Sequence, residues 1–318
     1  KTPLFVMSGT GLLNVMLNLF FVLVCDMSVD GVAIATTVSN AASAGILLTY
    51  LSRNRGVCRF SFKKLKIDKD ALKNIIYIGL PAGIQGALFS LSNMIIQSSI
   101  IKVNNMITPA GIGYQPVVKG NAAVANIESF AYTATNSVYQ ASVTFTGQNV
   151  GAEKYKRVGA VMRNCYIITF CIAEIAAGLI LIFRNPLLSL YGVVPGAAGT
   201  GEAIAFNTAC TRMLYMYPMY FLLAFMEVGS GVLRGLGKSL TSATVSLIGS
   251  CLLRIVWIFT IFAAHPTLEV IYISYPISWG LTALIHFICS LAVKRKLQKH
   301  QSEKSNCENI NSFKNCLT

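Results

Sequence analysis

The chain alternates long apolar runs with short polar connections. Eight runs of about 20 residues hold few charged side chains, and most of the Lys, Arg, Asp and Glu residues lie between them. A helix of that length crosses the hydrocarbon core of a bilayer, and in lipid only helices or closed barrels satisfy every backbone polar group. Because strict apolar–polar alternation is absent, the pattern predicts about eight transmembrane helices. The predicted spans are Leu4–Val24, Gly31–Leu51, Ile75–Ile101, Asn121–Phe145, Tyr166–Phe183, Leu214–Leu233, Val245–Ala264 and Val270–Val293.

Composition supports an all-α integral membrane protein. Hydrophobic residues make up 54% of the chain and charged residues 12%, whereas a soluble domain carries about 25% charged residues. The net charge of +14 could indicate a nucleic-acid partner, but its distribution argues against one. Alternate connections carry 21 of the 26 Lys and Arg residues, which fits the positive-inside rule. We therefore expect a multi-pass protein of the plasma membrane with both chain ends in the cytoplasm.

Sequence patterns of metal sites and enzymes are absent. The nine cysteines are scattered without CxxC spacing, and the three histidines do not cluster, so we expect no metal site. The chain has no P-loop, GxSxG or HExxH motif. We therefore expect a monomer that is not an enzyme, has no cofactor and does not use ATP.

The two ends of the chain share a layout. Leu12-Leu13-Asn14 aligns with Leu252-Leu253-Arg254, and at nearly the same offset the basic exit at Arg53 aligns with Lys294. The first two spans therefore repeat the layout of the last two in the same orientation, as in transporters built from parallel repeats.

This repeat predicts four regions. We expect the last two helices of an N-terminal lobe at 1–52, a cytoplasmic basic linker at 53–74, a six-helix C-terminal lobe at 75–298, and a polar, disordered cytoplasmic tail at 299–318. On this interpretation four helices of the N-terminal lobe would precede Lys1.

Three motifs mark helix starts and ends. They are Ile78–Gln85 (IGLPAGIQ), Thr144–Glu153 (TFTGQNVGAE) and Gly231–Ser239 (GVLRGLGKS). Pro81 suits the first turn or two of a helix, the glycines of the second motif suit a C-cap, and those of the third allow close helix packing. By itself, the physical interpretation of these glycines is capping and packing.

In this order and spacing the motifs resemble the second half of the multidrug and toxic compound extrusion (MATE) family, and most of all its bacterial drug-exporter branch. The segment Gly31–Thr36 resembles the sixth helix of that family, and the resemblance covers residues 1–298. It implies alternating access between two lobes, with export of small organic, often cationic and aromatic, compounds in exchange for H⁺ or Na⁺. Many relatives carry an acid where this chain has Leu88-Phe89-Ser90, so the coupling ion stays open.

Ionisable residues inside spans are functional candidates because burying a charge in the bilayer is costly. Glu227 leads, followed by Glu128 and Glu174. Arg234 lies seven residues after Glu227 on the same helical face, so a static Glu227–Arg234 ion pair is the structural alternative. Arg254 lies inside the seventh predicted span, where it would pair with one of these acids or with free carbonyls.

Uncharged polar and aromatic residues on the third and fourth predicted spans are candidates for lining a cavity. Interhelical hydrogen bonding alone would also explain the amides. The candidates are Gln85, Asn93, Gln97, Asn126, Asn136, Gln140, Tyr132 and Tyr139.

Two other functional classes stay open. A lipid-linked oligosaccharide flippase of related architecture should show a cationic groove, whereas the sequence places only Arg254 deep in a span. A membrane scaffold that transports nothing should lack a central cavity.

Overall fold

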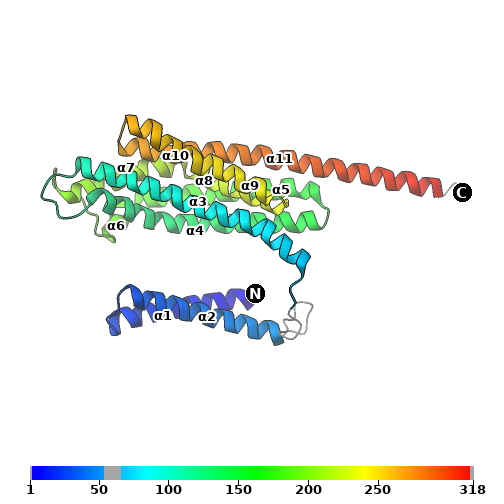
Figure 1. Cartoon of the computed structure of the whole chain (residues 1–318), viewed down its shortest axis with the longest axis horizontal. Coiled ribbons are helices and arrows are strands. Elements are labelled where there is room, and N and C mark those ends of the chain that lie inside the picture. The colour runs from blue at the N-terminus through cyan, green and yellow to red at the C-terminus, as the bar shows by residue number, and fades with distance from the viewer. Residues whose placement is uncertain (1, 54–65, 316–318) are drawn as a thin grey trace. The chain divides into compact units, whose positions relative to one another are not determined.

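The computed structural model describes residues 2–53 and 66–315, and all regular structure in that part of the chain is helical (Figure 1). Within these residues, seven helical segments are long and apolar enough to cross a membrane. The predicted fold class, an all-α integral membrane protein, is therefore confirmed. The seven segments are Thr2–Val24, Val29–Arg53, Gly83–Ile107, Tyr155–Ile182, Gly201–Gly235, Ser239–Phe262 and Leu268–Lys299.

The remaining predicted span, Asn121–Phe145, differs from the others. It coincides with α4 (Pro116–Gly151), a helix of 36 residues, which at 1.5 Å per residue is about 54 Å long. This helix is long enough to cross a bilayer but is not among the seven apolar segments. Its polar residues, among them Glu128 and Asn136, lower its mean hydropathy. These two side chains line a cavity inside the bundle.

The chain divides into two compact units, Lys1–Leu72 and Lys73–Thr318. In the first unit α1 (Thr2–Leu19) and the π-helical turn η1 (Phe20–Val24) form a hairpin with α2 (Val29–Arg53). Asn14 joins the two helices by donating from Nδ2 to Ser39 Oγ at 2.9 Å. Most of the predicted linker at 53–74 lies outside the described residues.

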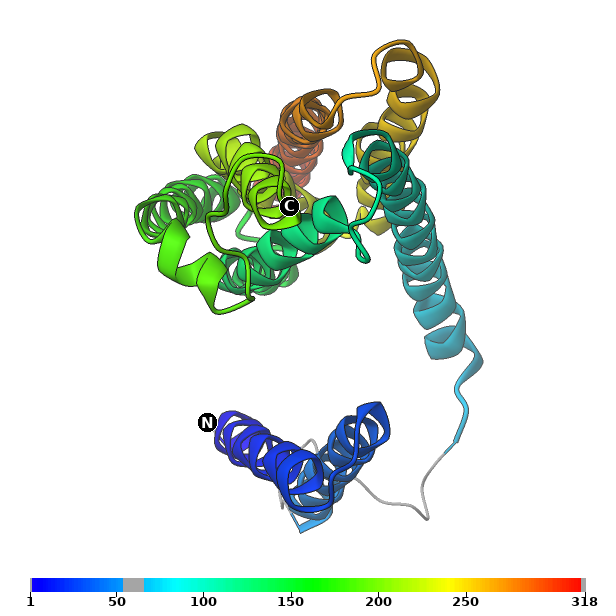
Figure 2. The same cartoon turned by 90° about the vertical axis from the view of Figure 1, so that its left-hand side faces the viewer.

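The second unit is a bundle of membrane-length helices, seen along its helices in Figure 2. Its elements are α3 (Lys69–Ile107, which begins at the unit boundary), α4, α5 (Tyr155–Ile182), α6 (Arg184–Ser189), α7 (Gly201–Met216), η3 (Tyr217–Met219), α8 (Tyr220–Gly235), α9 (Ser239–Ser246), η4 (Leu247–Leu252), α10 (Leu253–Trp257), η5 (Ile258–Phe262) and α11 (Leu268–Asn315).

Three predicted boundaries were wrong. Helix α3 begins at Lys69, so residue 81 lies well inside it rather than in its first turns. The predicted span Leu214–Leu233 is the second half of a longer segment, Gly201–Gly235. Helix α11 continues to Asn315 where a disordered tail was expected. Each helix extends past the apolar run because the flanking polar residues include no helix-breaking Gly or Pro.

Helix α8 is the centre of the second unit, where it packs against α4, α5 and α11. Tyr217 and Tyr220, at the start of this helix, are fully buried in the core. At its other end, a Cβ on Gly235 would lie 2.6 Å from Thr146 Cβ and 2.8 Å from Val143 O. Only glycine lets α8 approach α4 this closely, which agrees with the predicted packing role of the GVLRGLG motif.

Candidate functional site

A polar cavity of about 490 Å³ lies inside the second unit, between α3, α4, α8, α10 and α11. Its lining residues are Gln85, Gly86, Phe89, Asn93, Glu128, Tyr132, Asn136, Tyr139, Leu223, Met226, Glu227, Arg234, Arg254, Tyr275 and Trp279.

The cavity is open because α3 packs tightly along only part of its length. Ile96, Ile100 and Val103 of α3 are buried against Ile258 and residues near it. One to three turns earlier, α3 presents Gln85, Gly86, Phe89 and Asn93 to the cavity instead. Along this face of α3 the side chains thus change from buried apolar residues to residues that form one wall of the cavity.

Glu128 on α4 is held by Arg212 on α7. Arg212 Nη2 donates to Glu128 Oε2 at 2.6 Å, and the two side chains are 9% and 18% exposed, respectively. Arg212 Nη1 also donates to Asn121 Oδ1 at 2.8 Å and to Asn121 O at 3.0 Å. A carboxylate bound this closely by a buried guanidinium is part of a structural ion pair that joins α4 to α7.

Glu227 on α8 is not held in this way. The Glu227–Arg234 ion pair, the structural alternative that the sequence offered, is absent from the described residues. Arg234 Nη2 instead donates to Gln85 Oε1 on α3 at 2.8 Å. The Cα atoms of the two residues are about 10 Å apart along the helix axis, and no ion pair joins their side chains in the described part of the chain, unlike those of Arg212 and Glu128. Glu227 therefore lines the cavity without an ion-pair partner.

Arg254 is buried beneath an aromatic wall. Its Nε donates to Ser278 Oγ at 2.8 Å. Its guanidinium carbon lies 4.3 Å from the centre of the Tyr275 ring and 5.8 Å from that of Trp279. The predicted partner, an acid or a free carbonyl, is therefore replaced by a serine hydroxyl and two rings, an arrangement that leaves part of the guanidinium fork available to a ligand.

The cavity has more cationic than anionic groups. Glu128, Glu227, Arg234 and Arg254 line it, and Arg212 lies behind Glu128. Three guanidinium groups thus face two carboxylates. Because Arg stays protonated in proteins, the wall is net positive whether or not Glu227 carries a proton.

Nine predicted residues lie together in this cavity and four do not. The nine are Glu227, Glu128, Arg254, Arg234, Gln85, Asn93, Asn136, Tyr132 and Tyr139. The four outside are Gln97, Asn126, Gln140 and Glu174. Gln97 follows Ile96, where α3 packs against its neighbours, and Asn126 and Gln140 are exposed on α4. Glu174 lies on α5, and its Oε1 is buried without a hydrogen-bond partner among the described residues.

Sequence reasoning missed Arg212. It precedes the predicted span Leu214–Leu233 and so fell in a connection between spans, whereas it lies inside α7 and is 7% exposed. One signal was available, because no Gly or Pro interrupts residues 202–217 and a helix could therefore extend through Arg212. Tyr275 and Trp279 were also missed, because nothing in the sequence distinguishes them from other aromatic residues of an apolar span.

No group of three or more His, Cys, Asp or Glu residues lies close enough to hold a metal ion in the parts of the chain that the structure describes. Sodium needs oxygen ligands rather than imidazole or thiolate. The carboxylate and amide oxygens of Glu227, Asn93 and Asn136 line one cavity and are donors of that kind.

Comparisons with known proteins agree with this architecture. A family model described as MatE matches residues 81–260, more than half of the chain. The chain is 23% identical over 294 residues to the "Probable multidrug resistance protein YoeA" of Bacillus subtilis (strain 168), covering 90% of this chain and 59% of that protein. It is 24% identical over 254 residues to the "Probable multidrug resistance protein NorM" of Thermotoga maritima, covering 78% and 50%.

Solved structures share the fold. The "Outward-facing conformation of a multidrug resistance MATE family transporter of the MOP superfamily" matches with a TM-score of 0.78 at 17% identity, covering 93% of this chain and 62% of that one. The chain thus spans roughly half to three fifths of the length of the relatives it matches. With the family model matched over most of the C-terminal bundle, the chain belongs to the MATE family of multidrug efflux transporters.

Proposed function

We propose that the chain is part of a secondary antiporter that exports small organic compounds, often cationic and aromatic, across the plasma membrane in exchange for H⁺ or Na⁺. The observation that carries this proposal is Glu227, a cavity-lining carboxyl group without an ion-pair partner in the described residues, which shares the cavity with Tyr132, Tyr139, Tyr275 and Trp279.

Coupling follows from competition for one carboxylate. Glu227 can bind a proton, contribute to a Na⁺ site or accept the positive charge of a substrate, but it cannot neutralise two cations at once. A substrate cation and the coupling ion therefore exclude one another, while the aromatic rings supply a flat surface for the substrate. Glu128 is the weaker candidate because Arg212 already neutralises it.

Orientation is part of the proposal. Basic residues gather at the end of the bundle where α4 and α8 end and α5 begins, among them Lys154, Lys156, Arg157, Arg234 and Lys238. By the positive-inside rule this end faces the cytoplasm, so both ends of the chain are cytoplasmic and substrates enter the cavity from inside the cell.

A binding experiment with this chain tests the competition. The chain has two tryptophans; Trp257 donates to Val270 O outside the cavity, so Trp257→Phe leaves Trp279 as the sole reporter. A planar aromatic cation should quench Trp279, and its Kd should rise as pH falls or as Na⁺ replaces K⁺. Glu227→Gln should abolish this dependence, whereas Glu174→Gln, which changes an acid outside the cavity, should preserve it. A Kd that does not respond to pH or Na⁺, or a response that survives Glu227→Gln, would contradict the proposal.

One observation favours the second candidate function, a lipid-linked oligosaccharide flippase. The excess of guanidinium groups over carboxylates in and behind the cavity wall suits a diphosphate better than a cation. The same Trp279 assay separates the two functions. A flippase should bind a lipid diphosphate more tightly than the aromatic cation, and this preference should depend on Arg254.

A further inference from the structure

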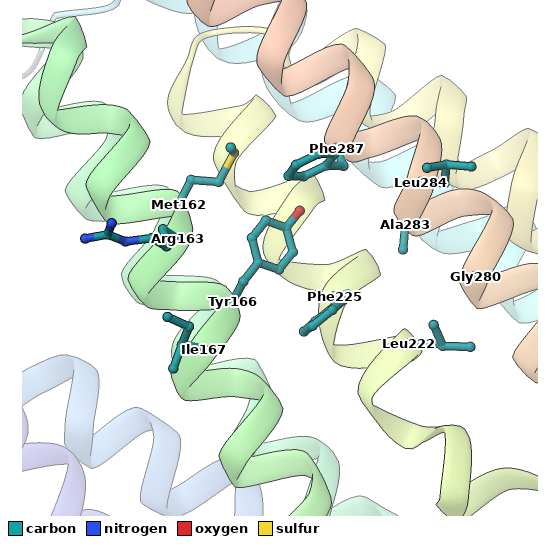
Figure 3. Close-up of a pocket in the computed structure, with 10 residues that line it drawn as sticks. All are labelled: Met162, Arg163, Tyr166, Ile167, Leu222, Phe225, Gly280, Ala283, Leu284 and Phe287. Carbon is teal, nitrogen blue, oxygen red and sulfur yellow. The ribbon is translucent and has the colours of Figure 1, made fainter.

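A second hollow lies on the other side of α8, away from the polar cavity. Helices α5, α8 and α11 enclose a groove of about 590 Å³ that shares no lining residue with the cavity. Figure 3 shows Met162, Tyr166, Phe225 and Phe287 around the space between the three helices. The volume is within the roughly 300–1,000 Å³ of small-molecule sites.

The walls of the groove are apolar. Tyr166 packs edge-on against Phe225 at 5.0 Å and against Phe287 at 5.9 Å between ring centres. Ile167 and Leu284, at its mouth, are each 56% exposed, so the groove opens on the outer surface of the bundle, at the depth of the apolar spans. Its natural occupant is therefore a hydrocarbon chain rather than water.

The Tyr166 hydroxyl points into the helix interface rather than into the groove. It is buried, lies 3.0 Å from the position of a Cβ on Gly229 of α8, and has no hydrogen-bond partner among the described residues. Tyr166 therefore gives the groove the apolar part of its ring, and the groove wall stays apolar.

A cation lies at one end of the groove. Lys294 follows Phe287 by seven residues on α11, and therefore lies on the same helical face about 10 Å further along the axis. Its Nζ reaches across to α5 and lies against Gly159, three residues before Met162. Lys294 forms no ion pair or hydrogen bond with the residues that the structure describes. Arg163 is at the rim, but its guanidinium points away from the groove in Figure 3.

We propose that this groove binds an anionic phospholipid, with one acyl chain between α5, α8 and α11 and its phosphate at Lys294. The apolar length with Lys294 at one end matches the layout of such a lipid, with Arg163 at the rim as a second cation, and basic pockets between transmembrane helices are a recognised type of anionic-lipid site. The site is independent of the transport cavity.

Native mass spectrometry of the purified full chain in detergent tests this site. The probe is an equimolar mixture of phosphatidylglycerol and phosphatidylcholine with identical acyl chains. We expect phosphatidylglycerol adducts to predominate. Lys294→Gln should lower the phosphatidylglycerol-to-phosphatidylcholine ratio about fivefold, the equivalent of about 1 kcal/mol per basic residue. Lys238→Gln, at an exposed cation near the same end but away from the groove, should not change it.

A separate experiment tests whether the groove holds the acyl chain of the lipid. A Cβ on Gly280 would lie 3.5 Å from Leu222, an ordinary contact, whereas Gly178 on α5 faces open space outside the groove. Gly280→Leu should fill the groove and reduce retention of both lipids severalfold; Gly178→Leu should not. Phosphatidylglycerol with a photoreactive acyl chain should label residues 162–167 and 280–287. A lipid ratio unchanged by Lys294→Gln, equal loss in the two glycine variants, or labelling elsewhere would overturn the proposal.

Discussion

The buried pair Arg212–Glu128 gives the most quantitative prediction. Arg212→Met removes three hydrogen bonds, one to Glu128 Oε2 at 2.6 Å and two to Asn121 at 2.8 and 3.0 Å. Asn121 Oδ1 keeps a partner because Tyr272 donates to it at 3.3 Å. Glu128 would keep no ion-pair partner among the described residues, because Arg212 is the one that it has there. Leaving one charge of a buried pair unpaired costs about 3–5 kcal/mol.

The companion variant separates charge from packing. In Arg212→Met/Glu128→Gln, a neutral amide of nearly the same shape replaces the stranded carboxylate. The loss of stability should then fall to about 1–2 kcal/mol, the cost of the hydrogen bonds alone. The two measurements imply a coupling free energy of about 2–3 kcal/mol between the side chains.

The assay is unfolding in mixed micelles with increasing SDS, followed by helical circular dichroism. We expect Arg212→Met to unfold at a clearly lower SDS fraction than the wild type, with the double variant in between. Lys119→Met, which changes an exposed cation on α4 that has no ion pair in the described residues, should shift stability by less than about 0.5 kcal/mol. The reasoning fails if the double variant is no more stable than Arg212→Met.

Three further predictions concern packing, selectivity and topology. Gly120→Ala should lower the free energy of unfolding by about 1–3 kcal/mol, because the new Cβ would collide with Ala205 O. The control Gly178→Ala, whose Cβ meets nothing within 4 Å, should be neutral or stabilising in the same SDS titration. Arg254→Gln should raise the affinity for an aromatic cation roughly fivefold in the Trp279 assay by removing a like charge from the wall, and an unchanged Kd would contradict this. In a cysteine-free background, an impermeant maleimide should label Ser28→Cys but not Lys156→Cys in intact cells; the reverse pattern would invert the proposed topology.

The spans could be predicted from sequence because the bilayer imposes a local rule. A run of about 20 apolar residues needs no knowledge of the rest of the chain, and seven of the eight predicted spans coincide with apolar helices. Helix ends were harder to predict. The segment Gly201–Gly235 extends past its apolar run because Arg212 is neutralised by a partner that the local sequence does not contain.

The site was only partly predictable because its contacts are distant in sequence. Arg212 and Glu128 are 84 residues apart, so the sequence around Glu128 does not reveal its basic partner. Arg234 lies on the same face as Glu227, yet it bonds to Gln85, 149 residues away. Helical periodicity places residues on a face, but the packing of α3 decides that Asn93 lines the cavity and Gln97, one turn on, does not.

The central claim is that Glu227 couples export to an ion gradient. The most direct measurement is dye efflux from cells that produce the full-length product of this reading frame, driven by an imposed H⁺ or Na⁺ gradient and normalised to the amount of transporter in the membrane. We expect Glu227→Gln to insert at wild-type abundance but to lose gradient-driven efflux, and Glu174→Gln to retain it. Efflux by Glu227→Gln at the wild-type rate under the same gradient would show that Glu227 does not couple transport.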